Sequence, residues 1–287
     1  MGFRTVVISS HCKLEYSLNY LVFKTVDDIK RINIDEIQTL IIESTAVSIT
    51  SSLLCELSKK KIKVIFCDEK RNPLFENVSY YGDSISYKRI SEQIKWDNEI
   101  KDKVWKEIVK EKIRQQAKVI KKISDLDYEI MMSFVIDVEN GDITNREGHA
   151  AKYYFNRIYG NKFNRNNDHE KNIFLNYGYT LLLSQFNKAI VNKGYLTQLG
   201  IHHKNTFNQF NLSCDLMEPF RPIIDKKVLS LNMDNYKSEL INLLGESVII
   251  ANQNQTLVNA INIYAASVFN ALNNKDASLI KFLDSYE

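Results

Sequence analysis

The hydrophobic pattern of this chain changes period near residue 82, and that change restricts the folds open to it. Before Gly82, short runs of apolar and β-branched residues are bounded by turn residues, as is typical of strands. Beyond it, apolar residues recur at the spacing of helix faces, and strand signals nearly vanish. We therefore predict an α+β protein with a small β-rich, sandwich-like domain (residues 1–82) followed by a larger all-α domain (residues 83–287).

The first domain is predicted to contain about six short strands and one helix. Its clearest strand-like segments are residues 3–8, 13–16, 20–23, 39–43 and 63–67. The second and third of these flank a short turn and favour a hairpin, whereas residues 50–60 have helical periodicity. No chemistry is evident in this domain, so we predict that it is a platform for dimerisation.

The second domain is predicted to be helical throughout, with residues 252–255 as a loop between two of its last helices. Its periodic segments are residues 88–122, 125–139, 168–192, 236–244 and 257–272. The first of these carries twelve lysines and arginines against six acidic residues. Such a helix can follow a DNA backbone without reading sequence, and Lys110, Arg114 and Lys118 are the candidate contacts. A solvated helix face stabilised by ion pairs one turn apart explains the same pattern.

Residues 198–225 combine acids, imidazoles and amides within one short segment, QLGIHHKNTFNQFNLSCDLMEPFRPIID. Two histidines are adjacent, His202 and His203, and Asp215, Glu218 and Asp225 follow them. Two of the three prolines of the chain restrict the backbone here. This composition indicates a site more than a packing element.

A second candidate acid stands at a predicted helix start. The run from Thr144 to Glu147 has the form of a capping box, in which the carboxylate would only satisfy the first backbone amides. However, Glu147 also shares a helix face with Ala151, Tyr154 and Ile158, so its carboxylate is expected to point inward. An inward carboxylate needs a cation, a metal or a donor. The spacing leaves the capping and the functional roles equally open.

If Glu147, Glu218 and one histidine converge, they form a mixed oxygen and nitrogen site for a divalent cation, with Mg²⁺ or Mn²⁺ fitting better than Ca²⁺. Adjacent residues point in different directions, so His202 and His203 are not expected to bind one ion. The chain has no HExxH motif and no CxxC pair, which argues against a zinc protease and a structural zinc site.

Both motifs resemble those of a known family. The segment after the Gln-Leu-Gly turn, together with Asn145-Arg146-Glu147-Gly148-His149-Ala150-Ala151, is similar to the CRISPR adaptation integrase family, Cas-one, in its type II-A form. The two motifs occur in the order and at the separation found in that family, and the similarity extends through essentially the whole chain. The resemblance implies DNA integration, in which a 3′-hydroxyl of a short duplex fragment attacks a phosphodiester at the edge of a repeat.

The resemblance also implies roles for individual residues. The histidine fifteen positions before the glutamate of Glu-Pro-Phe-Arg-Pro is His203, so Glu147, His203 and Glu218 become the catalytic metal ligands. Asp215 and Arg221 become supporting residues, although a salt bridge to Asp225 is an equally good explanation of Arg221. His202 is expected to pack or to touch DNA. The DNA contacts expected in addition to the lysine-rich helix are Arg146, His149, Lys152, Arg157, Lys162, Arg165, His202 and Lys204.

The expected partners are double-stranded DNA, both as fragment and as repeat-leader target, and a dimeric protein, Cas-two, flanked by two homodimers in a four-plus-two complex. Other type II-A adaptation proteins are further candidates. A net charge of +3 does not by itself indicate nucleic acid. We expect a cytoplasmic protein without a membrane partner. The sequence has no long apolar run and no leader, and its four cysteines are expected to be reduced thiols. Two alternatives remain: a metal-dependent nuclease that hydrolyses branched DNA, and a DNA-binding scaffold without catalysis.

Overall fold

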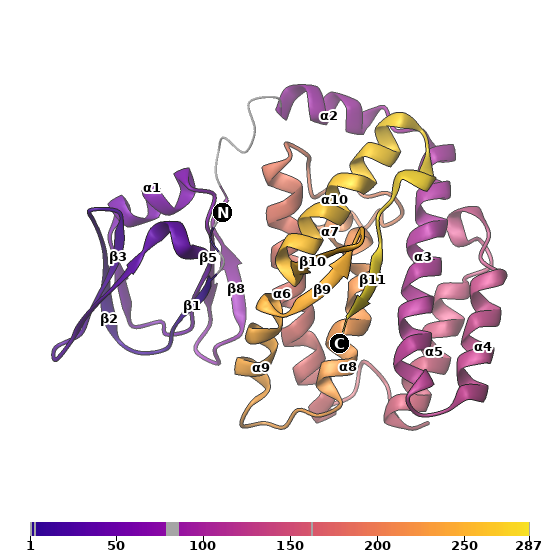
Figure 1. The fold of residues 1–287 in the computed structure, drawn as a ribbon, viewed down its shortest axis with the longest axis horizontal. Helices are drawn as coiled ribbons and strands as arrows, with labels where there is room; N and C mark the ends of the chain where they lie inside the picture. Colours follow the sequence, from indigo (N-terminus) through magenta and orange to yellow (C-terminus); the bar gives the residue numbers. More distant parts are fainter. Residues whose placement is uncertain (1, 3, 79–85, 162, 287) are drawn as a thin grey trace. The chain divides into compact units, whose positions relative to one another are not determined.

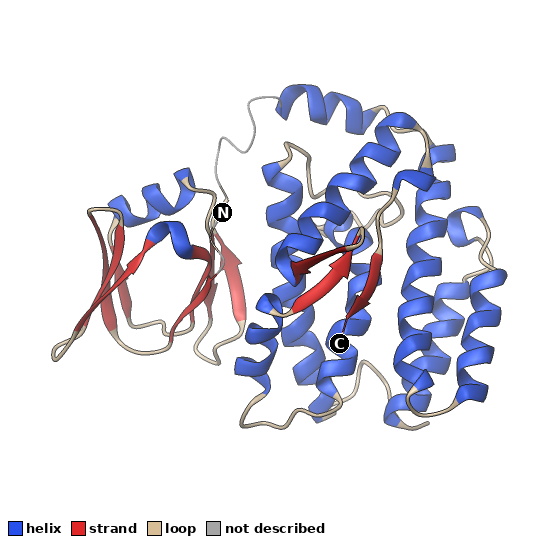
Figure 2. Cartoon of the chain, in the orientation of Figure 1, coloured by secondary structure: helices blue, strands red, loops and turns tan. Residues whose placement is uncertain are grey.

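The computed structural model describes residues 2, 4–78, 86–161 and 163–286, which form two compact units (Figures 1 and 2). The first unit contains the described residues before 79 together with Ile241–Gly245, and the second contains the other described residues. The domain boundary predicted at residues 82 and 83 lies outside the described residues and stays a prediction.

Two four-stranded sheets make up the first unit, with strand orders β1-β5-β7-β8 and β4-β3-β2-β6. The strands are β1 (Arg4–Ile8), β2 (Cys12–Ser17), β3 (Tyr20–Lys24), β4 (Ile29–Asn33), β5 (Ile37–Ile42), β6 (Val47–Ile49), β7 (Lys63–Cys67) and β8 (Pro73–Glu76). A 3₁₀ turn η1 (Ile34–Glu36) precedes β5, and helix α1 (Ser51–Lys59) leads into β7. Side chains from both sheets and from α1 form one core that includes Leu14, Leu40 and Leu53.

The predicted sandwich-like domain is confirmed, and so is its hairpin. β2 and β3 pair antiparallel through a tight turn in which Leu18 and Asn19 both have positive φ, as a two-residue hairpin turn requires. Strands β4, β6 and β8 were not among the predicted segments. β4 (IKRIN) and β8 (PLFE) are mostly solvent-accessible edge strands with little alternation, and β6 has only three residues.

The second unit is mainly helical, as predicted. Its helices are α2 (Ser86–Ile94), α3 (Asn98–Lys121), α4 (Asp125–Ile136), α5 (Arg146–Tyr159), α6 (Glu170–Asn192), α7 (Asn211–Met217), α8 (Arg221–Val228), α9 (Tyr236–Asn242), whose last residues belong to the first unit, and α10 (Leu257–Asn274). Short 3₁₀ turns are η2 (Asn140–Asp142), η3 (Glu218–Phe220), η4 (Leu243–Gly245, in the first unit) and η5 (Ala277–Leu279). The predicted single segment 88–122 is two helices, because Asp97 caps α3 by accepting a hydrogen bond from the Ile100 amide.

Helix α3 is the centre of this unit. It packs against α4, α5, α8 and α10, and Figure 1 shows α4 and α5 beside it. More than half of its residues are buried, including Trp105, Ile108 and Val109. A helix that is covered on several sides places its few polar side chains inside the protein, and this decides the position of the site.

The second unit also contains a three-stranded sheet, which contradicts the all-helical prediction in detail. Strands β9 (Ser247–Ile250), β10 (Gln253–Thr256) and β11 (Leu283–Tyr286) pair in the order β10-β9-β11. The predicted loop at residues 252–255 is wrong, because Gln253 begins β10 after a two-residue turn at Ala251 and Asn252. The polar side chains of β10 lack the apolar alternation that would identify a strand.

In the described residues, every helix is too short or too polar to span a lipid bilayer.

Candidate active site

The first acid of the site, Glu147, lies at the start of α5, where two other side chains cap the helix. The Asp142 carboxylate accepts hydrogen bonds from the amides of Arg146 and Glu147 at 2.9 and 3.0 Å. Asn145 is the N-cap and accepts from the Gly148 amide at 3.2 Å. The capping-box interpretation of Glu147 is therefore wrong, because the backbone amides are satisfied without its carboxylate.

The Glu147 carboxylate instead meets a lysine of α3. Lys112 Nζ lies 2.5 Å from Glu147 Oε1 and 2.5 Å from Glu218 Oε2, so one ammonium bridges acids from two other elements. Burial opposes the charged form of Lys112, but the two carboxylates outweigh it and raise the pKa of this lysine. The sequence analysis counted Lys112 among the basic residues of its helix but did not assign it to the site.

Glu218 is held from both sides by cations. It begins the 3₁₀ turn η3 between α7 and α8, where Pro219 interrupts the regular helix. Arg221 Nε lies 3.1 Å from Glu218 Oε1, opposite Lys112. Burial alone would raise the pKa of Glu218, but the charges of Arg221 and Lys112 lower it, so the residue is a carboxylate at neutral pH.

The third candidate ligand, His203, is positioned by Asp215. This fully buried carboxylate accepts hydrogen bonds from the amides of Ile201, His202 and His203 at 2.6, 3.0 and 3.1 Å. Its Oδ1 also lies 2.5 Å from His203 Nδ1, and this hydrogen bond raises the pKa of His203. With Nδ1 bound to a carboxylate, Nε2 is the ring nitrogen left to act on a ligand.

Close packing around Asp215 requires glycine at position 200. A Cβ there would stand 2.4 Å from the His203 carbonyl oxygen and 2.7 Å from Asp215 Oδ2. Both histidine rings contact Trp105 of α3: His202 stacks on the indole with centroids 4.4 Å apart, and His203 meets it edge-on. The planes of the two rings stand at 89° to each other, and the expectation that they do not share one ligand stays a prediction.

The alternative explanation of Arg221 is also wrong, because its ion pair is with Glu218 and not with Asp225. The Arg221 guanidinium lies over the ring of Tyr179, 4.8 Å from its centroid, and the Tyr179 hydroxyl donates to the Asp225 carboxylate. Asp225 is thus part of a buried layer directly behind the acidic site. Burial raises its pKa to about 6, against the opposing effect of the Tyr179 hydrogen bond.

The basic residues predicted to bind DNA do not form one cluster. On α3, Lys110 and Arg114 pair with acids one turn away, and Lys118 is within 3.4 Å of the Asp284 carbonyl oxygen, which favours the solvated-face explanation. Arg146 pairs with Asp137, and Arg157 pairs with Asp127. The side chains of His149, Lys152, His202 and Lys204 are exposed, and Lys162 lies outside the described residues. The DNA role of all these residues stays a prediction.

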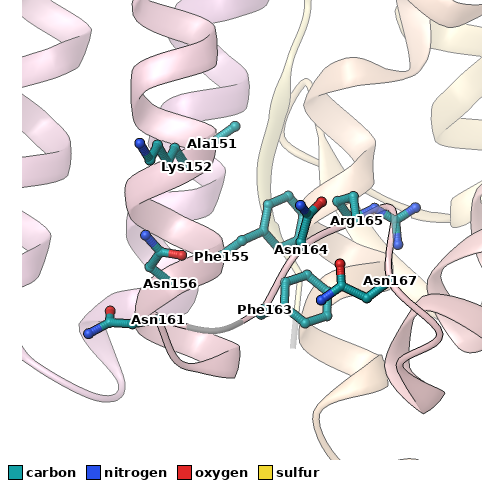
Figure 3. A pocket seen from close by; sticks show the side chains of 9 residues that line it. All are labelled: Ala151, Lys152, Phe155, Asn156, Asn161, Phe163, Asn164, Arg165 and Asn167. Carbon is teal, nitrogen blue, oxygen red and sulfur yellow. The ribbon is translucent and has the colours of Figure 1, made fainter.

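Two of them do line one hollow. Figure 3 shows Lys152 and Asn156 on α5, Arg165 and Asn164 on the following loop, and the ring of Phe155 between the helix and the loop. The hollow has a volume of about 620 Å³ and no acidic residue in its lining. Arg165 is fixed in place by hydrogen bonds to Asn172 and Asn176.

The donor set of the site suits a divalent cation. Glu147 and Glu218 provide hard oxygen ligands and His203 provides a nitrogen, a combination that Mg²⁺ and Mn²⁺ accept. Across the described ranges, no three histidine, cysteine or acidic side chains are grouped closely enough to hold a metal ion as they stand. A cation nevertheless already lies between the two glutamates, because the Lys112 ammonium contacts both. Glu147 and Glu218 therefore accommodate a cation between them, and the binding of a metal ion together with His203 stays a prediction.

Sequence reasoning missed Lys112, Trp105 and Asp142. Lys112 interrupts the apolar face of α3 formed by Ile108, Val109 and other buried side chains. A charged residue at such a position indicates a buried partner of opposite charge. The spacing of Trp105 on the apolar face of α3 is that of an ordinary core residue. Asp142 caps α5 from outside the motif that the sequence suggested.

Comparison with known proteins agrees with this description. A family model described as "CRISPR associated protein Cas1" matches residues 5–239. A CRISPR-associated endonuclease Cas1 from Neisseria meningitidis serogroup C (strain 8013) is 28% identical over 291 residues, covering 98% of this chain and 96% of that protein. A CRISPR-associated endonuclease Cas1 from Francisella tularensis subsp. novicida (strain U112) is 26% identical over 259 residues, covering 83% of this chain and 81% of that protein.

Solved structures share the fold. A casposase bound to integration product gives a TM-score of 0.77 at 19% identity, covering 99% of this chain and 94% of that one. A Cas1 protein from Thermotoga maritima gives 0.75 at 16% identity, covering 99% and 100%. A chain of a Cas6-RT-Cas1–Cas2 complex gives a TM-score of 0.75 at 18% identity. The match covers 99% of this chain and 36% of that one.

The buried carboxyl of Asp225 predicts a specific pH dependence of stability. Its folded pKa of about 6 lies above the ordinary aspartate value of 3.8, so between these two pH values the unfolded chain loses a proton that the folded protein keeps. The free energy of unfolding should therefore fall as pH rises from 4 to 6. The total fall in the free energy of unfolding should be about 3 kcal/mol, because a difference of one pKa unit corresponds to about 1.36 kcal/mol.

Chemical denaturation at pH 4 to 8 tests this with Asp225→Asn, which removes the titrating group. Relative to the natural protein, the variant should become more stable as the pH rises from 4 to 6. Asp234→Asn, which removes an exposed carboxylate, serves as control and should not. A difference between Asp225→Asn and the natural protein that does not change with pH would contradict the assignment.

Proposed function

Because the chain belongs to the CRISPR-associated Cas1 family, we propose that it inserts short DNA fragments into a repeat array by metal-dependent attack of a 3′-hydroxyl on a phosphodiester. The observation that carries the proposal is the meeting of Glu147 and Glu218 from separate elements around one cation, with His203 held by Asp215 beside them. The resemblance of the two sequence motifs supports assignment to the type II-A form.

Glu147, His203 and Glu218 would hold Mg²⁺ or Mn²⁺. When bound, the ion would supply Lewis-acid stabilisation at the crowded phosphorus centre. Asp215 holds His203 Nδ1, which leaves Nε2 as the ring nitrogen that would bind the ion. Arg221 pairs with Glu218, and the His203 ring is in edge-on contact with Trp105. These contacts preorganise the ligands before DNA arrives.

We propose that the DNA strand leaves the site along α5, over the hollow of Figure 3. The hollow begins at Ala151, one helical turn after Glu147, which is about 6 Å along the axis. Lys152 and Arg165 suit phosphate oxygens, and the aromatic and amide side chains between them suit bases. This location makes Lys152 and Arg165 better candidates for DNA contact than the paired basic residues of α3.

The proposed assembly is a homodimer that pairs with a Cas2 dimer, in the four-plus-two arrangement of the family, together with other type II-A adaptation proteins. The solved neighbours include chains of complexes titled Cas6-RT-Cas1–Cas2. Since the proposed substrates are DNA fragments and a DNA repeat array, we propose that the protein acts in the cytoplasm.

The edge of the first sheet supports a dimer contact. β8 is the last strand of the order β1-β5-β7-β8, and Leu74 and Phe75 on it are 68% and 57% exposed. Light scattering should give twice the chain mass, and Phe75→Lys should lower it while the control Val26→Lys, at a residue that is 96% exposed, should not. A monomer of the natural protein at micromolar concentration would refute this assembly.

A second function deserves testing because the curated relatives are named endonucleases. The same ligands could direct water rather than a 3′-hydroxyl to the phosphorus, which would hydrolyse branched DNA. The two reactions are distinguished by whether the 3′-hydroxyl of the fragment or a water molecule becomes bonded to the phosphorus. Strand transfer consumes a free 3′-hydroxyl and yields a covalent fragment–plasmid product, whereas hydrolysis yields only nicked DNA.

Glu218→Gln should abolish strand transfer, because an amide cannot replace the carboxylate charge at the site. The assay combines the protein, a Cas2 partner, Mn²⁺, a labelled duplex fragment and a supercoiled plasmid bearing the repeat. DNA affinity should stay within a few-fold, since basic residues supply most of it. Glu129→Gln on α4, at an exposed acid, is the matched control. Strand transfer by the Glu218→Gln protein at the natural rate would remove this residue from the site.

Lys152→Ala should weaken binding to any duplex and reduce the slope of log affinity against log salt by about one, because one phosphate contact is lost. Lys30→Ala in the first unit, whose side chain is 71% exposed, controls for the lost charge. Binding titrations at several salt concentrations give both slopes. Equal slopes for the two variants would exclude Lys152 from the DNA path.

A further inference from the structure

Lys112 is a cation in a place where the fold would otherwise put an apolar side chain. Its neighbours one turn before it on α3, Ile108 and Val109, are fully buried, and so is Ala117 further along. The Lys112 side chain itself is only 9% exposed. Removing an ammonium from water is unfavourable unless close anions compensate it. Lys112 is therefore tied to the acids it contacts.

The two acids depend on Lys112 in turn. Its 2.5 Å contacts place Glu147 Oε1 and Glu218 Oε2 no more than about 5 Å apart. Two carboxylates at that separation inside a protein repel each other strongly. In the metal-free protein the ammonium offsets this repulsion, and it holds the pair close together before any ion binds.

A divalent cation and Lys112 compete for the same atoms. Glu218 has two carboxylate oxygens: Oε2 contacts Lys112 and Oε1 contacts Arg221. Both oxygens already have a cation close by, so a metal ion that binds between the two glutamates competes with one of these cations for space and charge. Lys112 is the partner that also contacts the other proposed ligand, Glu147, and its unbranched stem is flexible. Arg221 is restrained by its position over the Tyr179 ring.

We propose that Lys112 is a positioning residue that occupies the cation position in the metal-free protein and is displaced when Mg²⁺ or Mn²⁺ binds. The inference rests on the proposed function in one respect, that Glu147 and Glu218 bind the metal. The displaced ammonium remains within reach of the site and can pair with a phosphate oxygen of DNA. Metal binding thereby converts an internal ion pair into a phosphate contact.

Differential amine labelling of the natural protein tests the displacement directly. The protein is treated briefly with an amine-acylating reagent, with and without saturating Mg²⁺, and each lysine is quantified by peptide mass spectrometry. Lys112 should be labelled several-fold more slowly than Lys110 without metal, and its rate should rise several-fold with Mg²⁺. Lys110, on the same helix but paired with Glu107, is the internal control and should not change.

Metal affinity provides a second, independent measurement. Lys112→Met removes the competing charge while keeping the length of the side chain, so Mn²⁺ should bind about tenfold more tightly than to the natural protein, as measured by electron paramagnetic resonance of free Mn²⁺. Its melting temperature without metal should be lower, and Mn²⁺ should raise it more than in the natural protein. Lys110→Met should behave like the natural protein in both measurements.

The outcomes separate the inference from the proposed function. If Mn²⁺ binds and Lys112 stays protected from labelling, the displacement is refuted while the metal-dependent function stands. If Lys112→Met is folded and binds Mn²⁺ no more tightly, the competition is refuted. If neither protein binds Mg²⁺ or Mn²⁺, both the inference and the metal-dependent function fail.

Discussion

The contact of one lysine with two glutamates determines the arrangement of the second unit around its site. Lys112 comes from α3, Glu147 from the start of α5 and Glu218 from the turn between α7 and α8. Each of these charges would be unfavourable in the protein interior by itself. Together they compensate one another, and their contact fixes the relative positions of three elements that lie far apart in sequence.

Two other acids of the site accept hydrogen bonds that fix the backbone around it. Asp142 satisfies the first amides of α5, which leaves Glu147 free to turn toward Lys112. Asp215 accepts three backbone amides and the His203 ring, so a single carboxylate shapes the loop from Ile201 to His203. The positions of Glu147 and His203 therefore depend on a second layer of hydrogen bonds.

Much of the fold and part of the site could be predicted from sequence, for reasons that particular residues illustrate. The hydrophobic period separated the β-rich part from the helical part. The motifs singled out Glu147 and Glu218, which the structure brings to one lysine, and the role of Glu147, His203 and Glu218 as metal ligands stays a prediction. The strand β10 was missed because QNQT has no apolar alternation. The spacing around Glu147 left its capping and functional roles open, and the structure removes the capping role because Asp142, outside the Thr144–Glu147 run, accepts the first amides of α5. The position of Lys112 depends on packing between helices, which sequence spacing alone does not reveal.

The central claim is that the pair of glutamates around Lys112, with His203 beside it, is a divalent-cation site. Crystals of the natural protein grown with Mn²⁺, with diffraction data collected near the manganese absorption edge, test it most directly. The account predicts an anomalous peak bounded by Glu147, His203 and Glu218, with Lys112 Nζ moved away from both carboxylates. A peak elsewhere, with Lys112 still bridging Glu147 and Glu218, would contradict it.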